Sequence, residues 1–223
     1  MSAGPVGAGG GAAAAPEIEL ACVDVLSTPY AAGPSVTLRM RAVEHTGVRL
    51  HALALRCQIR IEPLRRRYDD AEGARVTDLF GDRSRWGSSM HPLQLAFWSQ
   101  VLPGFAGETT FDLEIPVSYD VEVAAHKYLS ALADGEAPLL LLFSGQTFTV
   151  DGVGRLAVQP LPWQTEASAR LPVAVWRAAM DEHYPGQAWL RVSRELYDRL
   201  AERRSAAGLG SWDTLLASLL EEP

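Results

Sequence analysis

The residue pair with the clearest potential for chemistry lies in SYDVEVAAHKYLSAL, residues 118–132, where Glu122 and His126 are four residues apart. In a helix this spacing places both side chains on one flank, where both can reach one metal ion. Two ligands do not complete a stable site, and the sequence has neither an HExxH motif nor a Cys/His cluster to add others. Such a pair is also common on solvated helices. We therefore expect a solvated flank and no metal site.

The remaining reactive residue types form no catalytic pattern. The other histidines are scattered without ligand spacing: His45, His51, His91 and His183. No serine lies in a GxSxG turn, and neither GxGxxG nor GxxxxGK[ST] is present to bind a nucleotide. We expect no catalytic residue and no cofactor. Whether the protein is an enzyme stays open, with the balance against it.

The strongest candidate for a binding site is the loop GDRSRWGSSMHP within the irregular segment 64–94. It groups Arg83, Arg85, Trp86 and His91, and arginine and tryptophan are frequent anchors of protein interfaces. A loop of about thirty residues without a sustained period is usually functional or disordered. The alternative is a loop that folds over the protein body with Trp86 as its plug. Both interpretations stay open.

The charge of the chain excludes one class of partner. A net charge of −7 and a pI near 5.2 argue against general nucleic-acid binding, because neutralising phosphates requires a basic surface. The one basic run, residues 65–67, is flanked by Asp69 and Asp70. It is either the solvated end of a strand or a contact for an acidic partner.

The elements that must position these residues are mainly strands. Apolar and polar residues alternate with a period of two in residues 36–42, 53–61 and 111–117, which is typical of antiparallel sheets with one buried face. We expect seven or eight strands in a β-sandwich over residues 17–160, with a helix at 120–133 covering an apolar central strand. The predicted fold class is α+β: an antiparallel β-sandwich of immunoglobulin-like size with a C-terminal helical segment.

The C-terminal part, residues 161–223, changes to a helical period, and we expect it to pack on the sandwich. Ser193 and Ser211 are predicted N-caps of its last two helices. The final helix carries one apolar stripe: Trp212, Leu215, Leu216, Leu219 and Leu220. This stripe must be buried, either on the sandwich or on a partner protein.

The N-terminal stretch and the cysteines bear on the cellular compartment. Residues 1–16 are almost all glycine and alanine, so we expect a disordered tail that is neither a signal peptide nor a membrane span. Cys22 and Cys57 either form a disulfide across the sandwich or are two buried thiols, and the lack of an export signal favours thiols. We expect a soluble, cytoplasmic protein.

Four phrases together resemble a known protein family: DLFGDRSRWG, YDVEVAAHKYLSALADGEAPLLLLFSG, LPVAVWRAAMDEHYPGQAWLRVSRELYDRL and GLGSWDTLLASLL. This is an uncharacterised family of high-G+C bacteria, often encoded beside structural and maturation genes of nickel–iron hydrogenases. The resemblance covers about residues 17–220. It implies a genomic setting but no catalytic residues.

Two functions follow as hypotheses. The first is a non-enzymatic accessory or assembly protein that binds another protein, such as a hydrogenase subunit or maturation factor, through Arg83, Arg85, Trp86 and His91. The second is an enzyme or small-molecule-binding protein with an aromatic cleft between the sandwich and the C-terminal helices, walled by Trp98, Trp163 or Trp176. A third hypothesis, nickel or iron delivery, would require clustered metal ligands.

Overall fold

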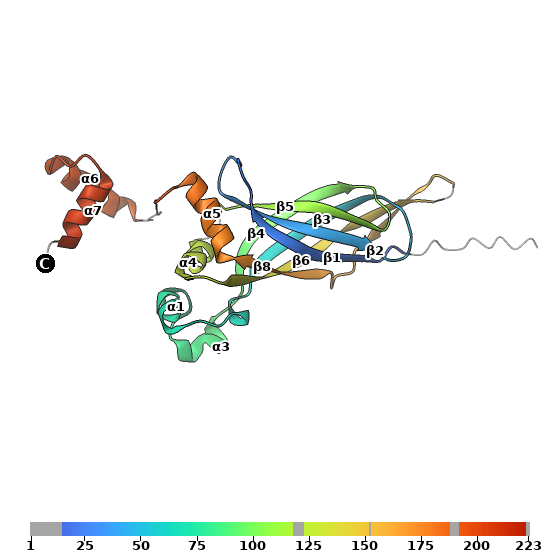
Figure 1. Ribbon diagram of the computed structural model, residues 1–223, viewed down its shortest axis with the longest axis horizontal. Helices are drawn as coiled ribbons and strands as arrows, with labels where there is room; N and C mark the ends of the chain where they lie inside the picture. The colour runs from blue at the N-terminus through green and yellow to red at the C-terminus, as the bar shows by residue number, and fades with distance from the viewer. Residues whose placement is uncertain (1–14, 118–122, 152, 188–191, 222–223) are drawn as a thin grey trace, which may run out of the picture. The chain divides into compact units, whose positions relative to one another are not determined.

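Two antiparallel β-sheets pack face to face as a sandwich (Figure 1). The computed structural model describes residues 15–117, 123–151, 153–187 and 192–221. Sheet A has the strand order β1-β2-β5; sheet B has the order β4-β3-β6, and both β7 and β8 pair with β6. The strands of these residues are β1 Ile18–Ser27, β2 Ser35–Glu44, β3 Leu50–Ile61, β4 Leu93–Pro103, β5 Glu108–Pro116, β6 Glu136–Val150, β7 Leu156–Pro160 and β8 Glu166–Pro172. The predicted fold class is confirmed.

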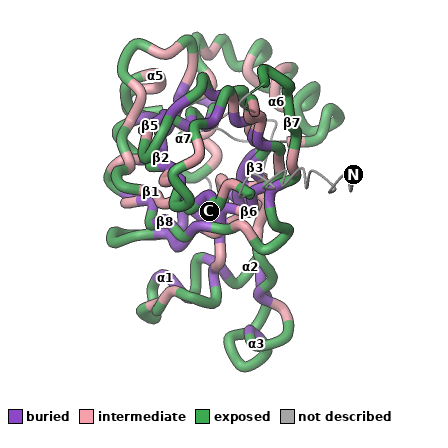
Figure 2. The backbone as a smooth tube through the Cα atoms, turned by 90° about the vertical axis from the view of Figure 1, so that its right-hand side faces the viewer, coloured by how far each residue is buried: buried purple, intermediate pink, exposed green. Residues whose placement is uncertain are grey.

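Side-chain alternation explains why these segments form sheets. The inward residues of β3 are at most 2% exposed: Leu53, Leu55, Cys57, Ile59 and Ile61. They share one core with Leu38, Met40 and Leu113 of sheet A. Buried positions recur along the strands of both sheets (Figure 2). Complete burial of each large apolar side chain contributes roughly 1.5–3 kcal/mol, so the pairing of the two inner faces provides most of the driving force.

The helices gather at one end of the sandwich and in two further segments. Their bounds are α1 Asp70–Arg75, α2 Thr77–Phe80, α3 Trp86–Ser89, α4 Val123–Ala131, α5 Val173–His183, α6 Arg194–Ala206 and α7 Trp212–Glu221, with 3-10 turns at Pro63–Arg65 and Arg83–Arg85. Helices α4 and α5 lie together at one end of the sandwich (Figure 1). Helix α5 packs against β1, β2 and β8 and buries Trp176. Within the described residues, no helix is long and apolar enough to cross a membrane.

The segment between β3 and β4, predicted to be irregular over 64–94, is a chain of short helical turns. Each turn is three to six residues long, too short for a helical period to emerge from the sequence. Its packing depends on aromatic rings: Tyr68 meets Trp86 edge-on at 5.3 Å and Tyr128 of α4 at 6.4 Å. The hydroxyls of Tyr68 and Tyr128 share a hydrogen bond of 2.7 Å. This segment is therefore packed against α4.

A buried ion pair fixes the same segment to the start of β6. Arg66 Nη2 donates to Glu72 Oε1 at 2.7 Å, and the two side chains are only 10% and 4% exposed. The Arg66 guanidinium also donates to the backbone carbonyls of Asp134 and Glu136, while Glu72 Oε1 accepts from Ala133 N at 2.7 Å. Arg66, the middle residue of the predicted basic run 65–67, is therefore an internal tether that joins this segment to the start of β6.

The tether predicts a large loss of stability in Glu72→Ala. Removing the carboxylate leaves the Arg66 charge buried without a partner, which typically costs about 3–5 kcal/mol. Asp70→Ala is the matched control, because Asp70 pairs with Arg83 at a fully exposed position, where an ion pair is worth about 0–1 kcal/mol. Urea unfolding of both variants gives the two free energies. Equal losses would contradict this role of Glu72.

One strand lies inside the region predicted to be helical from residue 161. Strand β8 pairs with the first half of β6, with Leu139 opposite Ala169 and Leu141 opposite Ala167. Its own pattern alternates, since Ala167, Ala169 and Leu171 are buried and the residues between them are exposed. The helical period therefore starts with α5. A run of seven residues containing two small alanines gives only a weak signal for a strand.

His183, at the end of α5, holds the loop between β1 and β2. Its Nε2 lies 2.9 Å from the carbonyl oxygen of Ala31 and its Nδ1 lies 3.2 Å from that of Ala179. Two carbonyl acceptors are both satisfied only by a protonated ring, which has two N–H donors. The hydrogen bonds to Ala31 and Ala179 therefore raise the pKa of His183 above its usual value.

This arrangement predicts a pH-dependent contribution to folding. Because the folded-state pKa of His183 is raised, its stabilisation is complete below about pH 6.5 and is lost as the pH rises through the folded-state value. The difference in unfolding free energy between the wild type and His183→Ala should thus be larger at about pH 5.5 than at about pH 8.5. Denaturant titrations at both pH values measure this difference. A difference that does not change with pH would contradict the proposed hold of the protonated His183 ring on the loop between β1 and β2.

Residues 187–223 form a separate compact unit containing α6 and α7. The predicted N-caps are confirmed, because Ser193 Oγ accepts from Leu196 N and Ser211 Oγ accepts from Thr214 N. The Arg204 guanidinium lies 4.1 Å from the centre of the Trp212 ring. The docking of this unit on the sandwich stays a prediction, and the predicted tail falls mostly on residues 1–14, outside the described residues.

Candidate functional site

The four predicted binding residues separate into buried and exposed positions. Trp86 is 9% exposed, and its Nε1 donates to the carbonyl of Gly81 at 3.0 Å. Arg83 lies 5.4 Å above the same ring and donates to Asp70 at 2.8 Å. Arg85 and His91 are exposed. Trp86 is thus the plug of its own segment, and the structure does not bring the four side chains together on one surface.

The candidate metal pair cannot be assembled from the described residues. Glu122 lies outside them, and His126 lies edge-on to Trp176 at 5.6 Å between ring centres. Burial lowers the pKa of His126, which favours the neutral ring. In the part of the chain that the structure describes, no group of three or more His, Cys, Asp or Glu residues is placed to hold a metal ion.

The three tryptophans of the predicted aromatic cleft have different surroundings. Trp176 is buried in the core, and Trp98 stacks on Phe111 at 5.7 Å between the sheets. Trp163 is 91% exposed on the loop between β7 and β8. A buried ring cannot line an open cleft, so Trp176 is not available as a wall.

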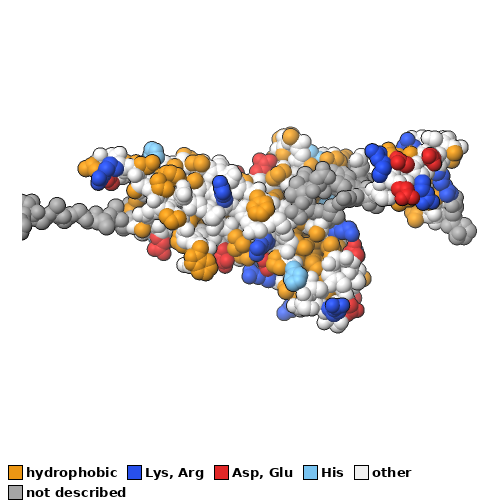
Figure 3. Space-filling view, turned by 180° about the vertical axis from the view of Figure 1, so that it is seen from behind, with side chains coloured by type: hydrophobic (Ala, Val, Ile, Leu, Met, Phe, Trp, Pro, Cys, Tyr) orange, Lys and Arg blue, Asp and Glu red, His pale blue; other side chains and the backbone are white. Residues whose placement is uncertain are grey.

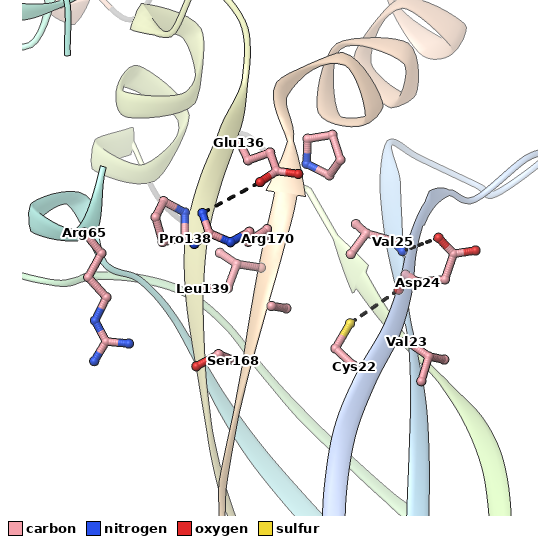
Figure 4. A pocket seen from close by; sticks show the side chains of 12 residues that line it. Cys22, Val23, Asp24, Val25, Arg65, Glu136, Pro138, Leu139, Ser168 and Arg170 are labelled. Atoms are coloured by element: carbon pink, nitrogen blue, oxygen red, sulfur yellow. Dashed lines mark hydrogen bonds and ion pairs between the residues drawn. The ribbon is translucent and has the colours of Figure 1, made fainter. Parts of the chain in front are cut away.

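A cavity of about 520 Å³ lies where β1 and β8, the edge strands of the two sheets, diverge (Figure 4). Several of its polar groups already have partners: Arg170 lies 3.7 Å from Glu136, and the Cys22 thiol donates to the carbonyl of Asp24. Burial raises the pKa of Cys22, so its thiol is a poor nucleophile. Neither cysteine forms a disulfide, and burial raises the pKa of Cys57 to about 12. We interpret this cavity as the seam between the sheets.

The outer faces of the two sheets differ sharply in chemistry. The outer face of sheet A is charged, with the ion pair between Arg39 and Asp112 at its centre. Acidic side chains also face solvent there from β1 and β5, including Glu19, Glu108 and Glu114. Such a surface is an ordinary solvated face of an antiparallel sheet.

The outer face of sheet B exposes large apolar side chains among polar ones, and we call it the open face. Its outward residues, read from the strand register, include apolar Ala52, Ala54, Phe97, Val101, Leu140, Leu142, Phe148 and Val158, polar Gln58, Ser99, Ser144, Gln146 and Ser168, and charged Arg56, Arg60, Glu166 and Arg170. Phe97 is 74% and Val101 is 64% exposed. Seen from behind, orange side chains gather over the sandwich with few charges between them (Figure 3). Exposed apolar residues grouped in this way mark interaction surfaces.

The centre of the open face is one cross-strand row with a hollow on each side. Ser99, Arg56 and Ser144 face one another across β4, β3 and β6. The first hollow, about 680 Å³, is lined by Val101, Ala54 and Gln146 beside this row; the second, about 640 Å³, is lined by Phe97, Gln58 and Leu142. The open face is therefore a shallow surface on which a polar central row is flanked by two rows that combine apolar side chains with one glutamine each.

Trp163 lies on a loop at the edge of sheet B, next to this row. The loop that carries it is bonded to β6 on both sides of Ser144, because Phe143 N donates to Thr165 O and Leu161 N donates to Gly145 O. The backbone of this loop thus lies beside the end of the row, and both Trp163 and Arg56 are exposed. Tryptophan and arginine are the residue types that dominate interface hot spots.

The sequence of β4 itself indicates this surface, but the indication lies in the outward positions of the strand and not in the buried ones. In LAFWSQVLP, the outward positions of β4 are Phe97, Ser99 and Val101. A solvated edge strand normally carries charged side chains at such positions. Two large apolar residues on the wet side of the strand are therefore informative.

The comparisons with known proteins identify the family. A model of a family of unknown function (DUF6084) matches residues 15–223. The chain belongs to this family. No curated protein matches the sequence. Among solved structures, a β-glucosidase from Kluyveromyces marxianus matches with 10% identity and a TM-score of 0.27, over 70% of this chain. The chain spans 15% of the length of that enzyme.

If the apolar residues of the open face serve binding, their truncation should leave folding intact. Phe97→Ala should change the unfolding free energy by less than about 0.5 kcal/mol, because its ring is already in water. Phe143→Ala is the control, since Phe143 is 3% exposed in the core and its truncation should cost about 3–5 kcal/mol. Thermal and urea unfolding measure both. A large loss in Phe97→Ala would make this ring a structural residue.

Proposed function

We propose that this protein is a non-enzymatic accessory or assembly protein that binds another protein through the open face of sheet B. The observation that carries the proposal is the exposure of Phe97 and Val101, with Trp163 at the edge, on one face of a sandwich whose other face is charged. An apolar face of this kind loses unfavourable contact with water when a partner covers it.

Because of this exposure, we place the proposed contact on the open face and not on the loop GDRSRWGSSMHP, which the sequence suggested. Trp86 and Arg83 are occupied within their own segment by Gly81 and Asp70. Arg85 and His91 remain exposed and can extend an interface, but they have no aromatic anchor beside them once Trp86 is buried. The open face supplies such anchors.

The resemblance to a family encoded beside nickel–iron hydrogenase genes suggests which partner to test first. We propose a hydrogenase structural subunit or maturation factor as that partner. The acidic net charge of −7 favours a protein over a nucleic acid in this role.

Copurification tests this function directly. The full chain should copurify with a tagged large or small hydrogenase subunit when both are expressed together, and Phe97→Asp should abolish the complex, because it places a charge on the apolar contact surface. Thr110→Asp is the matched control, since Thr110 is exposed on the outer face of sheet A. Absence of a complex with each hydrogenase protein tested would reject this partner. Equal loss in both variants would reject the open face.

A further inference from the structure

Arg56 is an uncompensated cation at the centre of the open face. Six arginines of this acidic chain have a carboxylate within ion-pair distance: Arg39, Arg66, Arg83, Arg155, Arg170 and Arg194. Arg56 belongs with Arg41, Arg65 and Arg85, for which the described residues offer no such partner, and it differs from these three in lying at the centre of the open face. Arg56 is exposed, and no carboxylate among the described residues lies within 4.0 Å of it. By strand register, the acidic residues of this face are Glu166, opposite Leu142 in the next row, and Glu136 at the start of β6, which pairs with Arg170.

The two neighbours of Arg56 in its row are hydroxyl side chains. Ser99 and Ser144 are exposed, and neither hydroxyl makes a hydrogen bond to another described residue. Adjacent strands are about 4.8 Å apart, so both hydroxyls flank the base of the arginine side chain. A guanidinium with a hydroxyl on each side offers a fork of donors that matches the two oxygens of a carboxylate.

We propose that the open face recognises a protein segment in which an aspartate or glutamate is surrounded by apolar residues. The carboxylate binds Arg56 between Ser99 and Ser144. The apolar neighbours enter the two hollows, against Phe97 on one side and Val101 on the other. This inference rests on the proposed function and adds the chemistry of the partner.

Charge complementarity selects this occupant over a second copy of the chain. A two-fold contact centred on the open face would bring Arg56 of one copy towards Arg56 of the other, with no acidic residue in the central row to compensate. The acidic outer face of sheet A provides carboxylates but has the Arg39–Asp112 ion pair at its centre instead of an apolar complement. A different protein that carries one acidic residue within an apolar surface fits both properties of the face.

Site-specific photo-crosslinking in the native host tests the proposal on the full chain. A photoreactive phenylalanine analogue replaces Phe97 or, separately, Val101, and the cross-linked segment is identified by mass spectrometry. The expected segment belongs to another protein and contains Asp or Glu between apolar residues. Arg56→Glu should lower the cross-linking yield roughly tenfold or more, and Arg56→Lys should lower it less, because lysine keeps the charge but loses the fork.

Two controls make the result specific. Arg41→Glu changes the same charge at an exposed position of β2 on the outer face of sheet A, and it should leave the yield unchanged. Replacing the partner's acidic residue with arginine should restore cross-linking to Arg56→Glu. Thermal unfolding of each variant verifies that the fold is retained.

The possible failures are distinguishable. An unchanged yield in Arg56→Glu, or a cross-linked segment without an acidic residue, would overturn the carboxylate chemistry while leaving the open face as a binding surface. A cross-linked segment from a second copy of this chain would overturn the choice of partner. No cross-link from either position would overturn the proposed function itself.

Discussion

Pairing along β6 is the constraint on which the rest of the structure depends. This strand, Glu136–Val150, pairs with β3 over most of its length, while its other edge holds β8 beside the first half and β7 beside the second. Gly145 permits the close approach to β3, because a Cβ there would collide with the carbonyl oxygen of Ala54. The gap between β8 and β7 is bridged by the loop that carries Trp163. One strand therefore sets both the width of sheet B and the position of its exposed tryptophan.

Charged side chains hold together the end of the sandwich where α4 lies, in addition to the contacts of the apolar core. Helix α4 ends with backbone carbonyls that lack partners within the helix, and arginines from other segments supply them: Arg75 donates to Ala131 and Arg177 donates to Leu132. Arg66 continues this pattern at Asp134 and pairs with buried Glu72. The segment between β3 and β4 is thus fixed by polar contacts to backbone that no apolar side chain could satisfy.

The two outer faces of the sandwich act as an internal comparison. Both belong to antiparallel sheets of the same core, yet the face of sheet A carries ion pairs and the face of sheet B carries Phe97, Val101 and an unpaired Arg56. The stability of the sandwich does not require this difference, because the inner faces bury the core in both sheets. The binding role that we propose for the open face would account for it. In the seam at β1 and β8, Arg170 already pairs with Glu136.

The sequence by itself determined the layered body of this protein. The alternation of apolar and polar residues in β2, β3 and β5 identified the sheets. The serine N-caps of α6 and α7 identified where these helices begin. Both signals are local in the sequence. Only the tertiary structure decided which residues of polar, irregular sequence are buried and what they contact. Trp86 and Arg66 lie in polar, irregular sequence, yet Trp86 is buried against Tyr68 of the same segment, and the Arg66 guanidinium bonds to the carbonyls of Asp134 and Glu136, which are distant in the chain. Likewise, the row of Ser99, Arg56 and Ser144 exists only because three separate strands pair in one register. Local patterns specify elements, whereas a surface is assembled from positions that the sequence keeps far apart.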